Sequence, residues 1–165
     1  PGPQTLGIVN ALFVADYLGE LAVHNIEQAS YWDIHNDITE QGGDYGYLSR
    51  TGAPDGDNVP RPSYFAFKMA SEALRGKLLE TKSENENVSA YLTENNGKKA
   101  LMVINKMPKT KAVIDLNIPG FTGKATLKQL RSDNMKNGYS SETIDVTEGG
   151  KITLPAWSVT TITIQ

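Results

Sequence analysis

The sequence contains no cysteine and only two histidines, His24 and His35. Disulfides, thiolate zinc sites and thiol nucleophiles are therefore excluded, and a histidine-rich metal cage is not expected. No apolar run approaches the roughly 18 residues that a membrane-spanning helix needs. The net charge of −3 gives no electrostatic reason to expect nucleic-acid binding. We therefore expect no cofactor, no metal, no nucleic-acid partner and no membrane partner.

The chain has an ordinary globular composition, 39% hydrophobic and 21% charged, and its first part shows a helical hydrophobic period. Two segments, 6–21 and 61–74, repeat apolar residues at a spacing of three to four, which predicts two amphipathic helices. In the first segment the repeating positions are Leu6, Val9, Phe13, Tyr17 and Leu21. Pro62 near the start of the second segment and Gly76 just beyond it suit the two ends of a helix.

The segment between the predicted helices divides into a short strand and a long loop. Residues 29–36 are rich in aromatic and β-branched side chains, which predicts a strand. Residues 37–60 hold many glycines and prolines and form a predicted loop of a length that is usually functional or disordered. A strand directly after a helix implies a parallel sheet, and a single parallel strand has no ladder partner. We therefore expect these residues to be the C-terminal part of a larger protein or to dock on another chain.

From Val88 onward the hydrophobic period changes to two, which predicts β-structure. The run Glu94-Asn95-Asn96-Gly97 is a hairpin signal, because Asn-Gly accepts positive φ angles at both turn positions. Seven short strands are predicted, over residues 88–93, 100–105, 113–118, 125–130, 143–146, 151–154 and 159–164. This spacing predicts an antiparallel β-sandwich over 81–165, separated from residues 1–80 by a polar stretch.

Four runs in the first part resemble the end of a (β/α)8 glycoside hydrolase barrel. They are residues 4–19 (QTLGIVNALFVADYLG), 29–36 (ASYWDIHN), 42–48 (GGDYGYL) and 61–67 (RPSYFAF). The resemblance is to retaining enzymes that act on plant cell-wall glycans: endoglucanases of family 44 and the related arabinofuranosidase and xylosidase families. It implies that residues 5–22 are the seventh barrel helix, 29–36 the eighth strand and 62–75 the eighth helix.

The end of the sequence extends this resemblance to an accessory domain. Residues 154–160 (LPAWSVT) resemble the closing strand of the small β-sandwich that follows such barrels. The fold class expected is thus α/β plus all-β: the last helix–strand–helix of a (β/α)8 catalytic barrel over 1–80, followed by an antiparallel β-sandwich over 81–165.

The resemblance implies a secreted glycoside hydrolase that cleaves plant polysaccharide with retention through two glutamates. In these families the glutamates end the fourth and seventh barrel strands, which this chain does not contain. We therefore assign no catalytic residue and expect the chain alone to be inactive. The expected partners are a polysaccharide or oligosaccharide substrate and the N-terminal barrel portion of the same enzyme. The alternative is a non-catalytic carbohydrate-binding or structural β-sandwich module.

The candidate substrate-binding residues are Trp32, His35, Asn36 and Tyr45. Trp32 stands near the carboxyl end of the predicted barrel strand, where its indole face can stack on a sugar ring. His35 and Asn36 follow on the same strand and can hydrogen-bond sugar hydroxyls, and Tyr45 can flank the cleft from the loop. The alternatives are a core tryptophan, side chains that satisfy loop backbone groups, and a tyrosine that holds the loop on the barrel rim.

Other polar residues give weaker patterns. Asp33 and Asp37 do not make a retaining carboxylate pair by spacing alone, because spacing along a loop fixes no distance between carboxyl groups. Asp33 should also point to the face of the strand opposite Trp32. Asp55 and Asp57 lie in a glycine-containing run, but their spacing does not match a calcium-binding loop. His24 follows the first predicted helix, away from the expected site, and is interpreted as structural or solvated.

Overall fold

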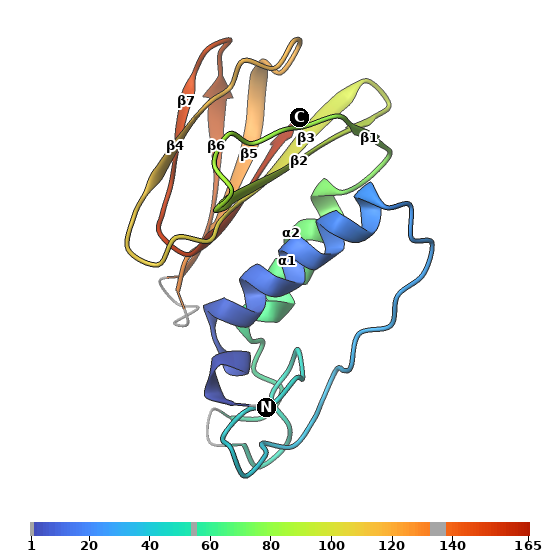
Figure 1. The fold of residues 1–165 in the computed structure, drawn as a ribbon, viewed down its shortest axis with the longest axis vertical. Helices are drawn as coiled ribbons and strands as arrows, with labels where there is room; N and C mark the ends of the chain where they lie inside the picture. The colour runs from blue at the N-terminus through green and yellow to red at the C-terminus, as the bar shows by residue number, and fades with distance from the viewer. Residues whose placement is uncertain (1, 54–55, 133–137) are drawn as a thin grey trace.

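The computed structural model describes residues 2–53, 56–132 and 138–165, and three layers make up the fold (Figure 1). Two helices cover one face of a six-stranded antiparallel sheet, and a two-stranded sheet covers the other. The helical elements are a 3-10 turn η1 (Pro3–Leu6), α1 (Ile8–Val23) and α2 (Pro62–Ala73). The strands are β1 (Lys77–Leu79), β2 (Val88–Asn95), β3 (Lys98–Asn105), β4 (Ala112–Asp115), β5 (Gly123–Leu130), β6 (Tyr139–Val146), β7 (Lys151–Leu154) and β8 (Ser158–Ile164).

Small side chains bring α1 and α2 together. Five alanines of the two helices, each at most 1% exposed, lie in one apolar cluster with residues of the large sheet: Ala11, Ala15, Ala66, Ala70 and Ala73. Because alanine has only a methyl group, such positions allow close contact at little cost in side-chain entropy. Both predicted helices are confirmed, and α1 begins and ends two residues later than its apolar repeat suggests.

Strand β3 shows how one sheet serves two hydrophobic cores. The strand order is β1-β2-β3-β8-β5-β6, which places β3 near the middle. Met102 and Ile104 belong to the cluster beneath the helices, whereas Leu101 and Val103 belong to the cluster beneath the β4–β7 sheet. Successive side chains of a strand point to opposite faces, so a strand covered on both sides is apolar at every position.

The β2–β3 hairpin confirms the turn predicted from Asn-Gly. Asn96 and Gly97 both have positive φ, 51° and 76°, as a two-residue turn of this kind requires. The ladder pairs Asn95 with Lys98 and continues to Val88 opposite Asn105. Each of the seven predicted strands overlaps an observed strand, although β4 ends at Asp115, three residues before the end of the predicted strand 113–118. β1 adds an eighth strand that the sequence did not predict.

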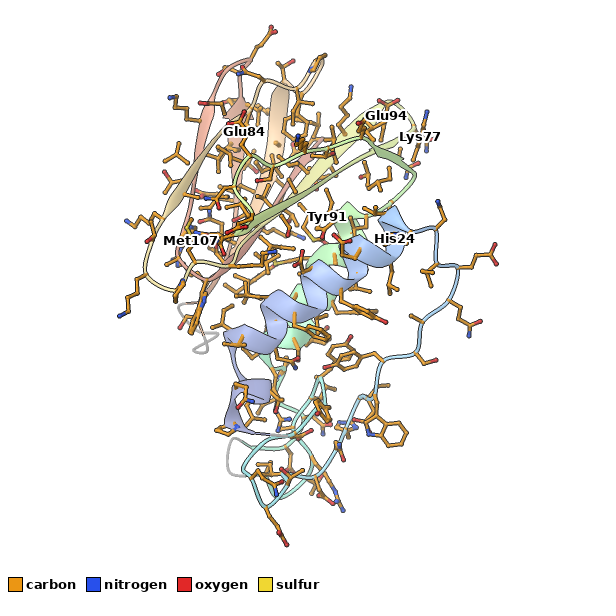
Figure 2. All side chains as sticks on the ribbon, viewed as in Figure 1. His24, Lys77, Glu84, Tyr91, Glu94 and Met107 are labelled. Carbon is orange, nitrogen blue, oxygen red and sulfur yellow. The ribbon has the colours of Figure 1, made fainter. Side chains whose placement is uncertain are left out.

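Tyr91 on β2 connects the large sheet to α1 and is 4% exposed (Figure 2). Its hydroxyl lies 2.7 Å from Asp16 Oδ1 and 2.8 Å from Glu20 Oε1, both on α1. A methyl group at Gly19 would stand 2.3 Å from the Tyr91 ring, so glycine makes room for the ring inside the helix. The helices therefore pack closely on the sandwich sheet.

The predicted strand over 29–36 forms only to a small extent. Within the described residues this segment has one isolated bridge, His35 to Leu48 in parallel orientation, and no ladder. The physical reason is the lack of neighbours, since a parallel strand is defined by the strands beside it. The boundary predicted at residue 80 stays a prediction; β1, at Lys77–Leu79, already belongs to the large sheet.

Candidate functional site

The candidate site lies in the loops between α1 and α2, on the side of the helices away from the sandwich (Figure 1). A polar cavity of about 350 Å³ opens there. Its lining combines hydrogen-bonding and charged side chains: His35, Asn36, Asp37, Arg50, Thr51 and Asn58. Two of the four sequence-predicted residues, His35 and Asn36, thus line one cavity, whereas Trp32 and Tyr45 do not.

Backbone hydrogen bonds bring three loop segments side by side at this cavity. Leu48 N donates to Ile34 O at 3.0 Å and Tyr47 N to Asp33 O at 3.1 Å. Ser49 N in turn donates to Val59 O at 3.0 Å. Main-chain hydrogen bonds therefore hold the residues around 34, 48 and 59 together, and these bonds fix the loop segments that form the cavity.

His35 and Asn58, which both line the cavity, are in contact through their side chains. His35 Nε2 lies 2.7 Å from Asn58 Oδ1, and because that oxygen is an acceptor, the ring nitrogen donates. The second ring nitrogen of a neutral His35 is then an acceptor for an outside donor such as a hydroxyl. Asn58 adopts a φ of 55°, a left-handed conformation that asparagine tolerates well.

Two charged residues, Asp37 and Arg50, also line the cavity. Arg50 Nη1 forms an ion pair with Asp37 Oδ2, and both side chains are more than half exposed. Asn36 Oδ1 accepts a hydrogen bond from Asp37 N at 2.9 Å. Because Asp37 is paired with Arg50, the cavity offers binding groups for hydroxyls rather than the two opposed carboxyl groups that retaining hydrolysis needs.

Trp32 is the most exposed large side chain near the site. The indole is 72% exposed, while Asp33 Oδ1 beside it is buried and has no hydrogen-bond partner among the described residues. The peptide bond that joins Trp32 to Asp33 is cis. Ile34 is also strongly exposed, so this segment presents a row of apolar groups to solvent.

An aromatic stack holds the site segment on α2. The rings of Tyr31 and Tyr47 lie 4.1 Å apart and nearly parallel, and Phe67 of α2 follows 5.2 Å from Tyr47. Burial raises the pKa of the Tyr31 and Tyr47 phenols, so both stay neutral. The Tyr31 hydroxyl donates to Tyr45 O at 3.0 Å and so positions the backbone of the half-exposed Tyr45.

A buried ion pair fixes the base of the same loop. Asp44 and Arg61 form a salt bridge with side chains that are 0% and 3% exposed. Asp44 Oδ1 also accepts from Gly46 N, and Asp44 N donates to Thr5 Oγ1 at 2.9 Å. This arrangement joins η1, the loop and the start of α2. Sequence reasoning missed it because the three segments lie far apart along the chain.

Sequence reasoning also missed Arg50, Thr51 and Asn58 as cavity residues, and only the turn residues around them gave a weak signal. Asp55, weighed as a calcium ligand, lies outside the described residues. In the described part of the chain, no three acidic or histidine side chains are grouped to hold a metal ion. Nor does any helix there have the length and apolar character to cross a membrane.

No protein-family model matches the sequence, and no curated protein matches it significantly. The structure, by contrast, matches several solved glycoside hydrolases along nearly its whole length. The family 51 α-L-arabinofuranosidase of Thermotoga petrophila has a TM-score of 0.76 at 19% identity, over 99% of this chain and 39% of that enzyme. The family 30 subfamily 8 xylanase of Clostridium acetobutylicum has a TM-score of 0.73 at 18% identity, over 99% of this chain and 40% of that enzyme. The family 44 xyloglucanase of Paenibacillus polymyxa has a TM-score of 0.62 at 15% identity, over 98% of this chain and 30% of that enzyme.

These likenesses establish the fold: two helices followed by antiparallel sheets, as in the C-terminal portion of barrel-plus-sandwich glycoside hydrolases. The chain spans 38% of the arabinofuranosidase of Thermotoga maritima and 38% of the family 30 endoxylanase of Clostridium papyrosolvens. The fold class predicted from the sequence is therefore confirmed, and the resemblance to these enzyme families is confirmed at the level of structure.

Proposed function

We propose that this chain is the C-terminal portion of a secreted glycoside hydrolase that cleaves plant cell-wall polysaccharide with retention. The observation that carries the proposal is the match of nearly the whole chain to one part of arabinofuranosidases, xylanases and a xyloglucanase. The two catalytic glutamates belong to barrel strands outside residues 1–165. Secretion is proposed because a cell-wall polymer is degraded outside the cell.

In this proposal the loop site forms part of the sugar-binding floor. The exposed indole of Trp32 offers a flat apolar face for the C–H surface of a pyranose or furanose ring. His35 and Asn36 line the adjacent cavity and bind hydroxyl groups, and the half-exposed Tyr45 borders the substrate path. Sugars are bound by such combinations of an apolar platform and a few placed polar groups.

The exposed apolar surface of α1 supports the presence of further barrel elements. The rings of Phe13 and Tyr17 stack 5.6 Å apart on that surface and are 60% and 47% exposed. An apolar hollow runs from them to Leu21, Tyr31 and Phe67. A contiguous exposed apolar surface of this kind marks an interaction site. We propose that the remaining barrel helices and strands cover it and pair with residues 32–36.

The alternative, a carbohydrate-binding or structural sandwich, has less support. A carbohydrate-binding face needs two or three aromatic rings in one exposed plane. Tyr91 and Phe121 are buried, at 4% and 0% exposure, while Trp157 is 37% exposed. Helices α1 and α2 also share one core with the sheet, so the sandwich does not stand apart from them. These observations favour an integral part of a barrel enzyme.

The test is to express the complete polypeptide that the gene encodes and to measure sugar release from arabinoxylan, glucuronoxylan, xyloglucan and mixed-linkage glucan. We expect hydrolysis of at least one polymer, and none by residues 1–165 alone. Trp32→Ala should raise KM about tenfold or more, in line with loss of one aromatic contact of about 1.5 kcal/mol. Trp157→Ala removes the sandwich tryptophan and should leave KM unchanged. Absence of hydrolysis on all four polymers, or equal effects of the two substitutions, would contradict the proposal.

A further inference from the structure

An asparagine is buried in α1 among side chains that are otherwise apolar. Asn10 is 8% exposed, and the other buried residues of α1 are aliphatic residues and a glycine. A buried amide costs free energy unless its polar groups are hydrogen-bonded, and asparagine favours helices less than alanine does. The partners of Asn10 therefore show why a polar side chain occupies this position.

The amide nitrogen of Asn10 makes two contacts outside α1. Nδ2 donates to Thr5 O in η1 at 2.9 Å and to the Tyr31 hydroxyl at 3.3 Å. Because an amide nitrogen only donates, the Tyr31 oxygen accepts this bond and keeps its own proton for another partner. That partner is Tyr45 O, at 3.0 Å. The Tyr31 hydroxyl thus connects α1 with the loop that holds Tyr45, at the end of the helices where the loops lie (Figure 1).

The side chain of Tyr31 is the anchor of the segment that leads to Trp32. In the described part of the molecule, residues 27–32 form no hydrogen bond between main-chain groups. The Tyr31 ring nevertheless stacks 4.1 Å from Tyr47, and the hydroxyl makes the two bonds to Asn10 and Tyr45. The ring and the hydroxyl therefore hold a segment that main-chain bonds do not hold.

Trp32 depends on this anchor for its position. Its indole is mostly exposed, and among the described residues no aromatic ring stacks on it. The residue that follows Trp32 is fixed by the bond from Tyr47 N to Asp33 O at 3.1 Å. The residue that precedes Trp32 is Tyr31. The backbone at Trp32 is therefore held on one side by a main-chain bond and on the other by a single side chain.

We propose that Tyr31 is a positioning residue of the sugar-binding floor: its hydroxyl, held by Asn10, fixes the backbone at Trp32 and Tyr45 before a sugar binds. The inference rests on the proposed function, since it describes how the same floor is held. A floor that moved freely would have to be ordered by the sugar, and the entropy lost would weaken binding. Tyr31 acts through Trp32 and Tyr45, so it should affect KM rather than the chemical step at the glutamates outside residues 1–165.

The first test follows Trp32 directly, in residues 1–165 carrying Trp157→Phe, so that Trp32 is the single tryptophan. Tyr31→Phe keeps the ring and removes the hydroxyl bonds. We expect it to increase at least twofold the fraction of Trp32 fluorescence anisotropy that is lost within about 10 ns, the range of side-chain and loop motion. Tyr139→Phe on β6 is the matched control and should leave this fraction unchanged. An unchanged fraction in Tyr31→Phe would overturn the proposal.

A second variant removes the same hydrogen bond from the helix side. Asn10→Ala leaves Tyr31 intact and should also increase the fast loss of anisotropy, whereas Val9→Ala, at an exposed position of α1, should not. Circular dichroism of each variant shows whether it folds. Should Tyr31→Phe fail to fold, Asn10→Ala decides the question. Equal anisotropy decays of folded Asn10→Ala and Val9→Ala would contradict the role given to the hydroxyl.

The kinetic test uses the complete polypeptide and a polymer that it hydrolyses. Tyr31→Phe should raise KM at least threefold and leave kcat within twofold of its original value. In a Trp32→Ala background the same substitution should raise KM by at most half that factor, because Tyr31 acts through Trp32. An equal factor in both backgrounds would mean a general structural role and refute the inference. Absence of hydrolysis would contradict the proposed function alone, and the anisotropy of Trp32 then decides this inference.

Discussion

The backbone hydrogen bonding of the sandwich and its two helices differs from that of the loop segment 24–60. In the sandwich, continuous ladders join neighbouring strands, such as the eight pairs of β2 with β3. In the segment 24–60, the described residues form two isolated bridges, and large apolar side chains such as Trp32 and Ile34 face solvent. The sandwich and its helices thus bury their apolar side chains within this chain, whereas the loop segment exposes large ones, as the proposed contacts with further barrel elements require.

The largest expected effect contrasts a core ring with an exposed ring. Phe121→Ala removes a fully buried phenylalanine from the sandwich core and should lower the free energy of unfolding by about 3–5 kcal/mol. Phe13→Ala removes a ring that is 60% exposed on α1 and should cost less than about 1 kcal/mol in residues 1–165. Urea denaturation followed by fluorescence measures both values. Similar losses of unfolding free energy for the two variants would contradict this distinction between the sandwich core and the exposed surface of α1.

A second contrast sets the buried ion pair of the loop against an exposed one. Asp44→Asn leaves the Arg61 guanidinium buried without its carboxylate and should cost about 3 kcal/mol. Asp37→Asn disrupts the exposed pair with Arg50 and should cost at most about 1 kcal/mol. Limited proteolysis reports the same difference locally, because loss of Asp44 should speed cleavage between residues 24 and 60. Equal cleavage rates for the two variants would show that the loop does not depend on this pair.

The contact between α1 and the sheet gives a third prediction. Gly19→Ala brings a methyl group into the Tyr91 ring and should destabilise the chain by about 1–3 kcal/mol, although alanine favours helices. In a Tyr91→Ala background the clash is gone, and Gly19→Ala should then stabilise by up to about 1 kcal/mol. Thermal unfolding of the four proteins completes a double-mutant cycle. A destabilising effect of unchanged size in both backgrounds would refute the clash.

The smallest expected effect is a dependence on pH at the same contact. Burial opposes ionisation of Asp16, but hydrogen bonds from Ser89 and Tyr91 and the nearby Lys106 ammonium outweigh it and lower the pKa of Asp16 below 3.8. A carboxyl group with a lowered folded-state pKa stabilises the fold above its unfolded pKa, and this contribution is lost as pH falls through the folded pKa.

Asp16→Asn should therefore be less stable than the unmodified chain at pH 6, and the difference should shrink toward zero as pH approaches 2. Asp145→Asn, at an exposed pair with Lys124, is the control and should change the stability by at most about 1 kcal/mol. Denaturation midpoints between pH 2 and pH 6 measure both effects. A stability difference for Asp16→Asn that is constant over this range would contradict the assigned cause.

Features encoded locally could be predicted from the sequence. The helices follow from the spacing of their apolar residues, and the β2–β3 turn follows from Asn96-Gly97. β1 could not be predicted, because a three-residue strand is too short to show a period and depends on its pairing with β2. For the same reason residues 29–36 have strand-forming side chains but no ladder in the described chain.

The candidate site was predictable only in part. The positions of His35 and Asn36 near the end of a predicted strand suggested polar binding groups, and the structure places both at one cavity. Arg50 and Asn58 reach the same cavity through loop hydrogen bonds that no local pattern reveals. The contact of Lys106 Nζ with Asp16 Oδ2 at 3.2 Å joins residues 90 positions apart, so no local pattern reveals it either.

The central proposal is that further barrel elements cover α1 and pair with residues 32–36. Its most direct test is amide hydrogen exchange at residues 29–36, compared between residues 1–165 alone and the complete polypeptide that the gene encodes. The proposal predicts exchange at least a hundredfold slower in the complete polypeptide, with β2, β3 and β8 unchanged. Equal exchange of residues 29–36 in the two proteins would contradict it.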